Sequence, residues 1–329
     1  MRQTSHRFRE NVVAALHQPN LRVALERTTT LLRSRRHEML AGYPEYDAAR
    51  AVAERIKDHT LAHLDHYLEA FERNATASGA HVHWASTPKE ATDIIVGICR
   101  AHGAKSATRV KSMLGEEIGV GEALAAAGIE RVETDLAEHI IQLAGDPPSH
   151  IVMPAMHKTH EEVAELFRRK HREPANSGEV GALVESARRE LRPKYLTADV
   201  GISGANFIVA ETGSVVTVTN EGNAELTTTP PKVHIVNVGI EKLVPTMEHA
   251  TVYIRLLARA ALGMEITQYT TFHNGPKRAG DLDGPEEMHI VLVDNRRTEM
   301  LDGFLRPMLR CIRCGACMNH CPVYGAIGG

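Results

Sequence analysis

Aromatic side chains, long apolar runs and a disulfide framework are all lacking in this chain of 329 residues. Aromatic residues make up only 4% of a sequence that is 43% hydrophobic, so its core has to be mainly aliphatic. No segment approaches the roughly 18 apolar residues that span a membrane, and the first twenty residues contain no signal-peptide core. With a net charge of −3 and no clustered basic face, the chain lacks the electrostatic footprint of a nucleic-acid-binding protein. We therefore expect a cytoplasmic protein without a transmembrane segment, able to associate peripherally with a membrane.

The few cysteines that are present gather at one place. There are five, and four of them lie within eleven residues near the carboxyl terminus: Cys311, Cys314, Cys317 and Cys321, the last followed by Pro322. Secreted proteins instead distribute their cysteines as a disulfide framework, so a tight cluster indicates a metal site. The fifth, Cys99, stands in the apolar stretch DIIVGICRAHG, where a small buried side chain is expected.

The spacing C-x₂-C-x₂-C-x₃-C-P is that of bacterial ferredoxins and predicts [4Fe–4S] chemistry. A structural zinc site is the alternative, but zinc sites usually separate two ligand pairs by a longer stretch. In two-cluster ferredoxins the cysteine before proline ligates the other cluster. We therefore assign Cys311, Cys314 and Cys317 to a first cluster and Cys321 to a second.

Two clusters need more ligands than these residues supply. We accordingly expect two [4Fe–4S] clusters in a full-length protein of which residues 1–329 are a fragment with an incomplete ligand set. An incomplete set also predicts that the segment after Arg310 is a poorly packed appendage, and that the domain before it folds without the cluster.

Hydrophobic periodicity divides the chain into three parts: a helical segment over 1–79, an α/β domain over 80–297 and the start of a ferredoxin-type region over 298–329. One long helix is expected over 47–79, with further helices over 89–103, 113–127, 136–143, 160–170, 179–191, 246–263 and 298–310. Short strands are expected at 81–85, 107–110, 131–134 and 150–153, and capping boxes at Thr87 and Thr159 open two of the helices. This alternation predicts an α/β fold in which helices cover both faces of a parallel sheet.

A richer β pattern follows residue 200. Residues 207–219 are expected to form a hairpin around Glu211-Thr212-Gly213, and Val233–Val238 a fully buried strand. Two more strands are expected near 266–272 and 288–293.

Ligands of open α/β sheets bind beyond the carboxyl ends of the strands, so polar residues at those points are candidates for a small-molecule site. Glu211, Lys111 and His157 are the candidate catalytic residues, of which Glu211 could act as a base, and Lys111 or Lys158 could hold a carboxylate or phosphate. The other candidate binding residues are Ser112, Glu133, Asp135, Thr212, Gly213, Asn220, Glu221 and Gly222. The alternative is that all of these are ordinary polar loop and turn residues.

Six blocks of the sequence resemble the lactate utilization protein B family: KSMLGEEIG, VETDLAEHIIQLAGDPPSHIVMPAMHK, DVGISGANFIVAETGSVVTVTNEGNAEL, PKVHIV, DLDGPEEMHIVLVDN and CIRCGACMNHCPVYGAIGG. The resemblance covers nearly the whole chain. It implies a fold similar to ribose-5-phosphate isomerase and CoA-transferase domains, and the role of iron–sulfur subunit in a bacterial three-protein system that oxidises L-lactate to pyruvate.

Three functions follow as hypotheses. The first is electron transfer within a lactate-oxidising complex, as an oxidoreductase subunit that is inactive alone and whose partners are the other subunits and an electron acceptor. The second is an isomerase- or transferase-like enzyme with a structural cluster, which would turn over a sugar phosphate or acyl-CoA without an acceptor. The third is a redox-sensing interaction protein.

Overall fold

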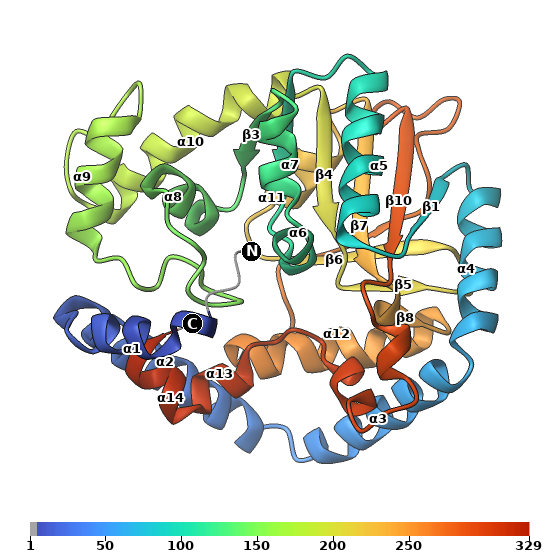
Figure 1. The fold of residues 1–329 in the computed structure, drawn as a ribbon, viewed down its shortest axis with the longest axis horizontal. Coiled ribbons are helices and arrows are strands. Elements are labelled where there is room, and N and C mark those ends of the chain that lie inside the picture. Colours follow the sequence, from blue (N-terminus) through green and yellow to red (C-terminus); the bar gives the residue numbers. More distant parts are fainter. Residues whose placement is uncertain (1–4, 329) are drawn as a thin grey trace.

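A six-stranded parallel sheet forms the centre of the molecule (Figure 1), in a computed structural model that describes residues 5–328. Its strand order is β1-β10-β7-β4-β2-β3, and every neighbouring pair is parallel. The strands are β1 (His81–Ala85), β2 (Ser106–Arg109), β3 (Glu130–Glu133), β4 (Val200–Gly204), β7 (Val233–Gly239) and β10 (Glu287–Val293). The α/β fold with a parallel sheet, expected from the sequence, is confirmed.

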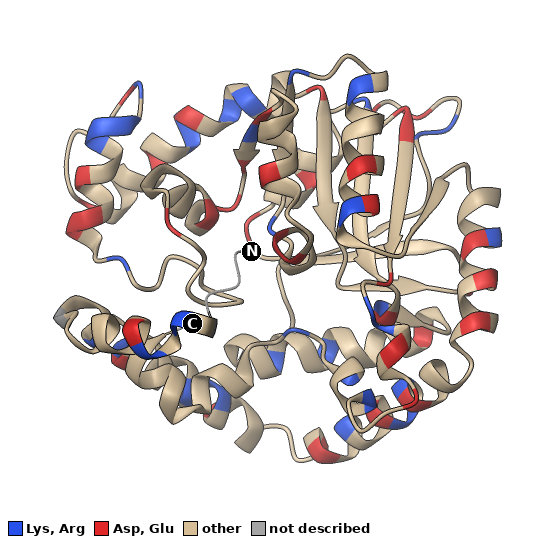
Figure 2. Ribbon diagram, viewed as in Figure 1, with Lys and Arg blue, Asp and Glu red and all other residues tan. Residues whose placement is uncertain are grey.

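The middle strands are buried on both faces. All seven residues of β7 are buried, and β4 and β7 contain no charged residue (Figure 2), as expected for parallel strands that are covered on both sides. One face packs against α5 (Pro88–Ala101), α6 (Met113–Ile118) and α7 (Val120–Ala126). The other packs against α4 (Leu64–Ala77) and a second sheet.

This second sheet has four short strands in the order β8-β5-β6-β9. The expected hairpin is confirmed, because β5 (Phe207–Val209) pairs antiparallel with β6 (Ser214–Thr219). Alternate residues of β5 serve different layers: Ile208 faces the main sheet, while Phe207 and Val209 face α12 (Met247–Leu262) and α3 (Tyr46–Ala62). The remaining strands are β8 (Leu243–Val244) and β9 (Tyr269–His273).

Two further groups of helices complete the fold (Figure 1). A lobe beside β3 contains α8 (Leu136–Ala144), α9 (His160–Lys170) and α10 (Val180–Thr197), which share one apolar cluster. The other group joins the two ends of the chain, because α1 (Phe8–Leu16) and α2 (Pro19–Ala41) lie against α13 (Ala316–His320) and α14 (Pro322–Ile327). Helix α11 (Asn223–Thr228) belongs to neither group and contacts β4 of the main sheet. No helix within residues 5–328 is both long and apolar enough to cross a bilayer.

The expectation that the segment after Arg310 is poorly packed is wrong. Tyr324 is 6% exposed and packs with Leu25 of α2 and Met156, and its hydroxyl donates to the Ser149 carbonyl at 2.8 Å. The segment therefore has its own apolar anchor on the first long helix.

Several expected elements differ from the structure in detail. Residues 150–153 form no strand, because the Ile151 and Val152 backbone lies in a turn organised by the His150 ring. The helix over 47–79 is two helices that meet at His63, and the one over 113–127 is split at Gly119, whose φ of 78° is left-handed. Helix α10 passes through Pro193 to Thr197, and residues 298–310 form two short 3₁₀ turns instead of a helix.

Candidate functional site

Cys311, Cys314 and Cys317 lie close together where the chain passes from the 3₁₀ turn Arg306–Arg310 into α13; Cys311 and Cys314 stand in the connecting loop, and Cys317 in the first turn of α13. Arg313 and Gly315 adopt positive φ angles of 60° and 75°, which let the chain turn sharply around the thiols. Burial raises the pKa of Cys314, and the neighbouring Cys311 and Cys317 raise it further, as expected for sulfur atoms that repel one another as thiolates. The Arg313 backbone N–H donates to Cys311 Sγ at 3.4 Å. All four cysteines are free thiols.

Cys321 lies in a different environment. Its Sγ accepts the Tyr324 backbone N–H at 3.5 Å and packs beside the apolar cluster of Leu25, Met156 and Tyr324. Cys99, in contrast, is fully buried in the core between α5 and the main sheet, where burial raises its pKa to about 11. The environment of Cys99 therefore differs from that of the cysteine loop, as expected from its apolar sequence context.

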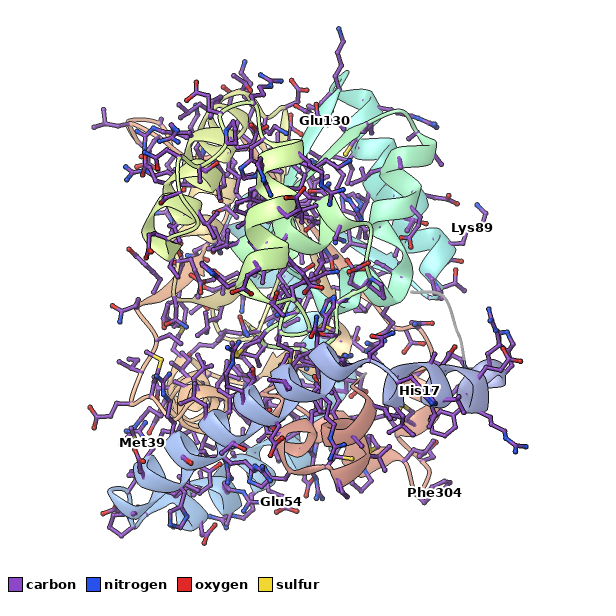
Figure 3. The ribbon with its side chains drawn as sticks, turned by 90° about the vertical axis from the view of Figure 1, so that its left-hand side faces the viewer. His17, Met39, Glu54, Lys89, Glu130 and Phe304 are labelled. Atoms are coloured by element: carbon purple, nitrogen blue, oxygen red, sulfur yellow. The ribbon has the colours of Figure 1, made fainter. Side chains whose placement is uncertain are left out.

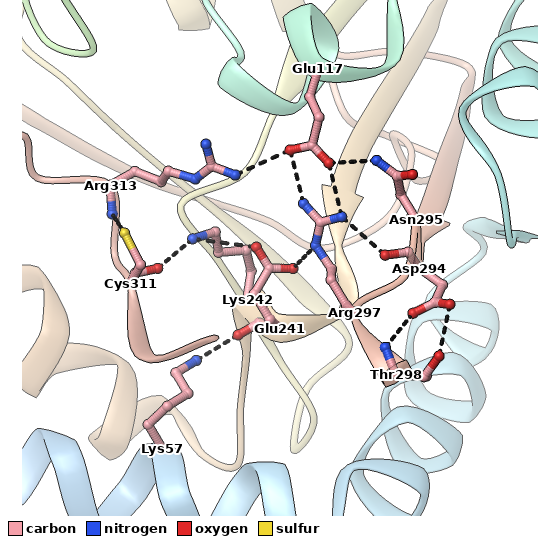
Figure 4. A network of polar contacts seen from close by, with 10 residues as sticks. All are labelled: Lys57, Glu117, Glu241, Lys242, Asp294, Asn295, Arg297, Thr298, Cys311 and Arg313. Carbon is pink, nitrogen blue, oxygen red and sulfur yellow. Dashed lines mark hydrogen bonds and ion pairs between the residues drawn. The ribbon is translucent and has the colours of Figure 1, made fainter. Parts of the chain in front are cut away.

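A network of charged side chains connects the cysteine loop to the main sheet (Figure 4). Lys242, just after β7, donates to the Cys311 carbonyl at 2.7 Å, and its neighbour Glu241 accepts from Arg297 Nε at 2.5 Å. Arg297 also forms a two-pronged pair with Glu117 of α6, with both N–O distances at 3.1 Å. Glu117 in turn accepts from Arg313 of the loop at 3.2 Å. The loop is thereby held at two points, one backbone and one side chain.

Pairing keeps the members of this network charged. Burial alone would raise the pKa of Glu117 and Glu241, yet Arg297 holds the pKa of Glu117 below its ordinary range, and Lys242 with Arg297 does the same for Glu241. Lys57 of α3 lies beneath, donating to the carbonyls of Glu241 and Leu243 at 2.7 and 3.1 Å. Burial lowers the pKa of Lys57 to about 7.

The hydrogen bonds of His150 provide separate evidence on whether the cysteine loop suits an iron–sulfur cluster, whose sulfur atoms accept hydrogen bonds. Its Nδ1 accepts the backbone N–H groups of Val152 and Met153 at 3.0 and 3.1 Å, so the ring proton must reside on Nε2. That Nε2–H is buried and meets no acceptor at full hydrogen-bond geometry among the described residues. Burial lowers the pKa of His150 to about 4, and Asn319 of α13, whose own Oδ1 is unsatisfied, opposes this shift as a hydrogen-bond partner. The ring lies against Gly315, with Nε2 3.5 Å from where a Cβ would stand.

A buried imidazole N–H that lies against Gly315 of the cysteine loop is compatible with an iron–sulfur centre, whose sulfur atoms accept hydrogen bonds. Gly315 fits as well, because any side chain there would press against Val152 and His150 at 3.2 and 3.3 Å. The residues present therefore suit a [4Fe–4S] group at Cys311, Cys314 and Cys317. Among residues 5–328, no three cysteine, histidine or carboxylate side chains converge closely enough to hold a single metal ion.

A cavity of about 450 Å³ separates the carboxyl edge of the main sheet from the cysteine loop. Its polar end is formed by residues that follow β2, β4, β6 and β7, and its apolar wall by aliphatic residues of α2 and α12. Arg313 and Lys242 line the cavity and also belong to the network that holds the loop. The polar lining includes Lys111, Ser112, Asp135, Asn206, Asn220, Glu221 and Asn237, and the apolar wall includes Leu31, Leu32, Leu257, Ala258, Ala261 and Leu262.

The structure brings five of the predicted site residues together around this cavity: Lys111, Ser112, Asp135, Asn220 and Glu221. Two of them also cap helices, since Ser112 accepts the Gly115 N–H and Asp135 accepts those of Ala137 and Glu138. Ser112 further donates to Asn237 at 2.9 Å, and Gly204 permits this approach because a Cβ there would lie 2.7 Å from the Ser112 hydroxyl.

The other predicted residues lie outside the cavity lining. Glu133 is 2% exposed and pairs with Arg109 at 2.8 Å, in the interior of the fold. His157 and Lys158 both contact Asp146, at 3.2 and 2.6 Å, in the loop that was expected to follow a strand.

The hairpin turn is packed against other elements. Glu211 accepts the Met247 N–H at the start of α12, and the Thr212 hydroxyl donates to Ser214. Gly213, with φ 69°, fits closely over Ala75 of α4. Gly222, with φ 73°, is the N-cap of α11.

Sequence reasoning missed several residues of the site. Lys242, Asn237 and Arg297 follow or end predicted strands and could have been found by the same strand-end rule. His150 was placed inside an expected strand. Glu138 is 4% exposed near Lys111, and burial, followed by repulsion from Glu133, raises its pKa to about 7, which no sequence pattern indicates.

Comparisons with known proteins agree on one family. The LUD domain family matches residues 68–293. Lactate utilization protein B of Geobacillus sp. (strain WCH70) is 45% identical over 98% of this chain, which covers 68% of that protein. The uncharacterized electron transport protein YkgF of Escherichia coli (strain K12) is 43% identical over 98% of this chain, which covers 68% of it. A DUF162 family protein from Deinococcus radiodurans, solved by crystallography, aligns with 70% of this chain and 98% of its own, with a TM-score of 0.36 and 13% identity.

Proposed function

The chain belongs to the LUD domain family, together with the lactate utilization proteins B, and from this membership we propose that it is the iron–sulfur electron-transfer subunit of a system oxidising L-lactate to pyruvate. That oxidation releases two electrons and two protons. The name of the Escherichia coli relative, an electron transport protein, supports the same role. Its partners would be the other subunits of the lactate system and a downstream electron acceptor.

The observation that carries the proposal is the arrangement of Cys311, Cys314 and Cys317 in one loop. They are close enough for their charges to act on one another, and the His150 ring lies against Gly315 of the same loop. A [4Fe–4S] group held by these thiolates would accept and release one electron at a time.

The rest of the chain supports the loop. Lys242 fixes the Cys311 carbonyl, Arg313 is fixed by Glu117, and both contacts lead back to the carboxyl edge of the sheet. These contacts fix the backbone of the loop and thereby orient the thiols.

We propose that Cys321 serves a second cluster. Its separate packing beside α2 supports this assignment. The remaining ligands of the two clusters would come from cysteines outside residues 1–329.

The test is anaerobic reconstitution of the purified chain with iron and sulfide, followed by metal analysis and electron paramagnetic resonance. Iron and sulfide should bind, and dithionite should produce a paramagnetic signal. Cys314→Ser should lose most of the bound iron, whereas the matched control Cys99→Ala should keep it. Because the core lies elsewhere, replacing Cys311, Cys314 and Cys317 with serine should leave the main thermal unfolding transition nearly unchanged.

Stoichiometric zinc in place of iron would contradict the proposal, as would iron binding that survives Cys314→Ser. With the partner subunits added, L-lactate should reduce the reconstituted chain. If the loaded protein is instead reduced by dithionite but never by L-lactate and its partners, the electron-transfer role stands and the lactate assignment is wrong.

A further inference from the structure

The cavity between the sheet edge and the cysteine loop has two chemically different ends. Polar side chains from the strand ends line one end, and the opposite wall consists of aliphatic side chains from α2 and α12. A volume of about 450 Å³ lies within the range of small-molecule sites in proteins. Such a cavity suits a ligand with a charged or hydrogen-bonding head and an apolar body.

Lys111 is the side chain at the polar end that most clearly needs a partner. Its ammonium group forms no hydrogen bond and no ion pair within 4.0 Å with any part of the chain that the structure describes. Burial lowers its pKa, while Asp135, Glu138 and Glu221 act on it from longer range to keep it charged. A half-buried cation without a contact partner favours an anionic ligand group.

Glu221 lines the same cavity as Lys111. Each influences the other's charge, yet no ion pair joins them, so a gap remains between the ammonium and the carboxylate. A ligand that filled this gap would offer an acceptor to Lys111 and a donor to Glu221.

We propose that this cavity binds a 2-hydroxycarboxylate, with its carboxylate paired to Lys111, its hydroxyl donating to Glu221 and its alkyl body against the α2 and α12 wall. The choice of a hydroxy acid rests on the proposed function in lactate oxidation. The pairing at Lys111 and the apolar wall rest on the geometry alone.

The flanking carboxylates favour a singly charged acid over a phosphate. Asp135 and Glu221 line the cavity and act on Lys111, so their charges would repel a phosphate dianion there more strongly than a monoanion. The cations Lys242 and Arg313 also line the cavity, but Lys242 is already engaged by Glu241 and the Cys311 carbonyl, and Arg313 by Glu117. Lys111 balances the single charge of a carboxylate, and Asp135 already caps α8 with its own oxygen. Inorganic phosphate is therefore the appropriate competitor in a test.

The size of the cavity predicts that binding affinity depends on the length of the ligand's alkyl chain. A three-carbon acid occupies only part of about 450 Å³, leaving space along Leu31, Leu257 and Leu262. Each additional methylene buried against that wall should tighten binding roughly fourfold. L-2-hydroxyhexanoate should consequently bind more tightly than L-lactate.

The experiment is isothermal titration calorimetry on the full chain purified without iron, so that binding is measured independently of any cluster. The ligands are L-lactate, L-2-hydroxyhexanoate, hexanoate and inorganic phosphate. We expect L-2-hydroxyhexanoate to bind most tightly, hexanoate more weakly because it lacks the hydroxyl, and phosphate weakest of all.

Matched variants test each contact. Lys111→Met should weaken binding of every acid by about tenfold or more, since it removes a charge-assisted hydrogen bond. The control Lys89→Gln should change nothing, because Lys89 lies exposed on α5, away from the cavity (Figure 3). Glu221→Met should reduce the preference for L-2-hydroxyhexanoate over hexanoate.

If Lys111→Met does not fold, Leu31→Glu provides a second measurement. Leu31 is 46% exposed at the cavity wall, so a polar residue is tolerated there, and the variant should lose the gain from the longer chain. Absence of acid binding to the unaltered chain, tighter binding of phosphate, or unchanged affinity in both variants would overturn the proposal. Iron incorporation is measured separately, so failure of the cavity proposal is distinguishable from failure of the iron–sulfur proposal.

Discussion

The main sheet and the cysteine segment over 309–327 are stabilised in different ways. In the sheet, Ile202, Ile235 and Ile290 are each 0% exposed, and apolar layers cover both faces. In the segment and the turns that lead into it, few residues are buried, chiefly Leu309 and Tyr324, while Phe304 is 92% exposed at the edge of the molecule (Figure 3).

Apolar burial is proportional to area and tolerates small displacements, whereas hydrogen bonds and ion pairs need specific geometry. The sheet thus provides a rigid edge, and the cysteine loop is positioned on that edge mainly through Lys242, Arg313 and Glu117. A loop whose ligands must be placed accurately is anchored by directional contacts, while the core that supports it is held by burial.

The largest effect is expected where the two regions meet, at Arg297. Arg297→Met would leave Glu117 without its main cation and the buried Glu241 with Lys242 alone, so the free energy of unfolding should fall by about 3 kcal/mol. Urea denaturation followed by circular dichroism measures this loss. The neighbouring Arg296→Met should change stability by less than about 0.5 kcal/mol, because Arg296 is exposed. Equal effects of the two variants would mean that the network does not couple sheet and loop.

A smaller and local effect is expected at the anchor of the segment. Tyr324→Phe removes the hydroxyl that donates to the Ser149 carbonyl and should destabilise local packing by about 1 kcal/mol. Hydrogen exchange should accelerate in residues 311–327 and remain unchanged in β7. Tyr67→Phe, which removes an exposed contact with His59, is the matched control. Acceleration throughout the sheet would show that the two regions unfold as one unit.

The smallest effect concerns His150, whose N–H lies beside the cysteine loop. If it donates to a sulfur atom, it stabilises the reduced, more negative state, and His150→Phe should lower the midpoint potential by roughly 40 mV, equivalent to about 1 kcal/mol for one electron. Redox titration followed by electron paramagnetic resonance measures the shift at constant iron content. His157→Phe serves as the control, because His157 contacts Asp146 and Ser149 instead. A potential unchanged in His150→Phe would assign that ring a purely structural role.

The sheet region was predictable because its signals are local. The apolar run Val233–Val238 and the capping box at Thr87 each determine an element without reference to distant residues, and both match the structure. The strand-end rule likewise located Lys111, Asp135 and Glu221, which line one cavity.

The cysteine segment was less predictable because its neighbours are distant in sequence. Nothing near Tyr324 indicates that its hydroxyl meets Ser149, and nothing near Cys311 indicates that Lys242 holds its carbonyl. Residues 150–153 read as a strand because they are apolar, but the His150 ring, accepting two backbone N–H groups, folds them into a turn.

The packing of α14 on α2 has a consequence for biosynthesis. The two helices are separated by nearly the whole sequence, yet they lie side by side (Figure 1). At roughly 5–20 residues per second, the ribosome needs on the order of 15–60 s to make the intervening chain. During that interval the apolar side of α2 around Leu25 lacks the cover that Tyr324 provides in the folded chain. The packing of α14 on α2 and the final placement of the cysteine loop are thus completed together, late in the synthesis of these residues.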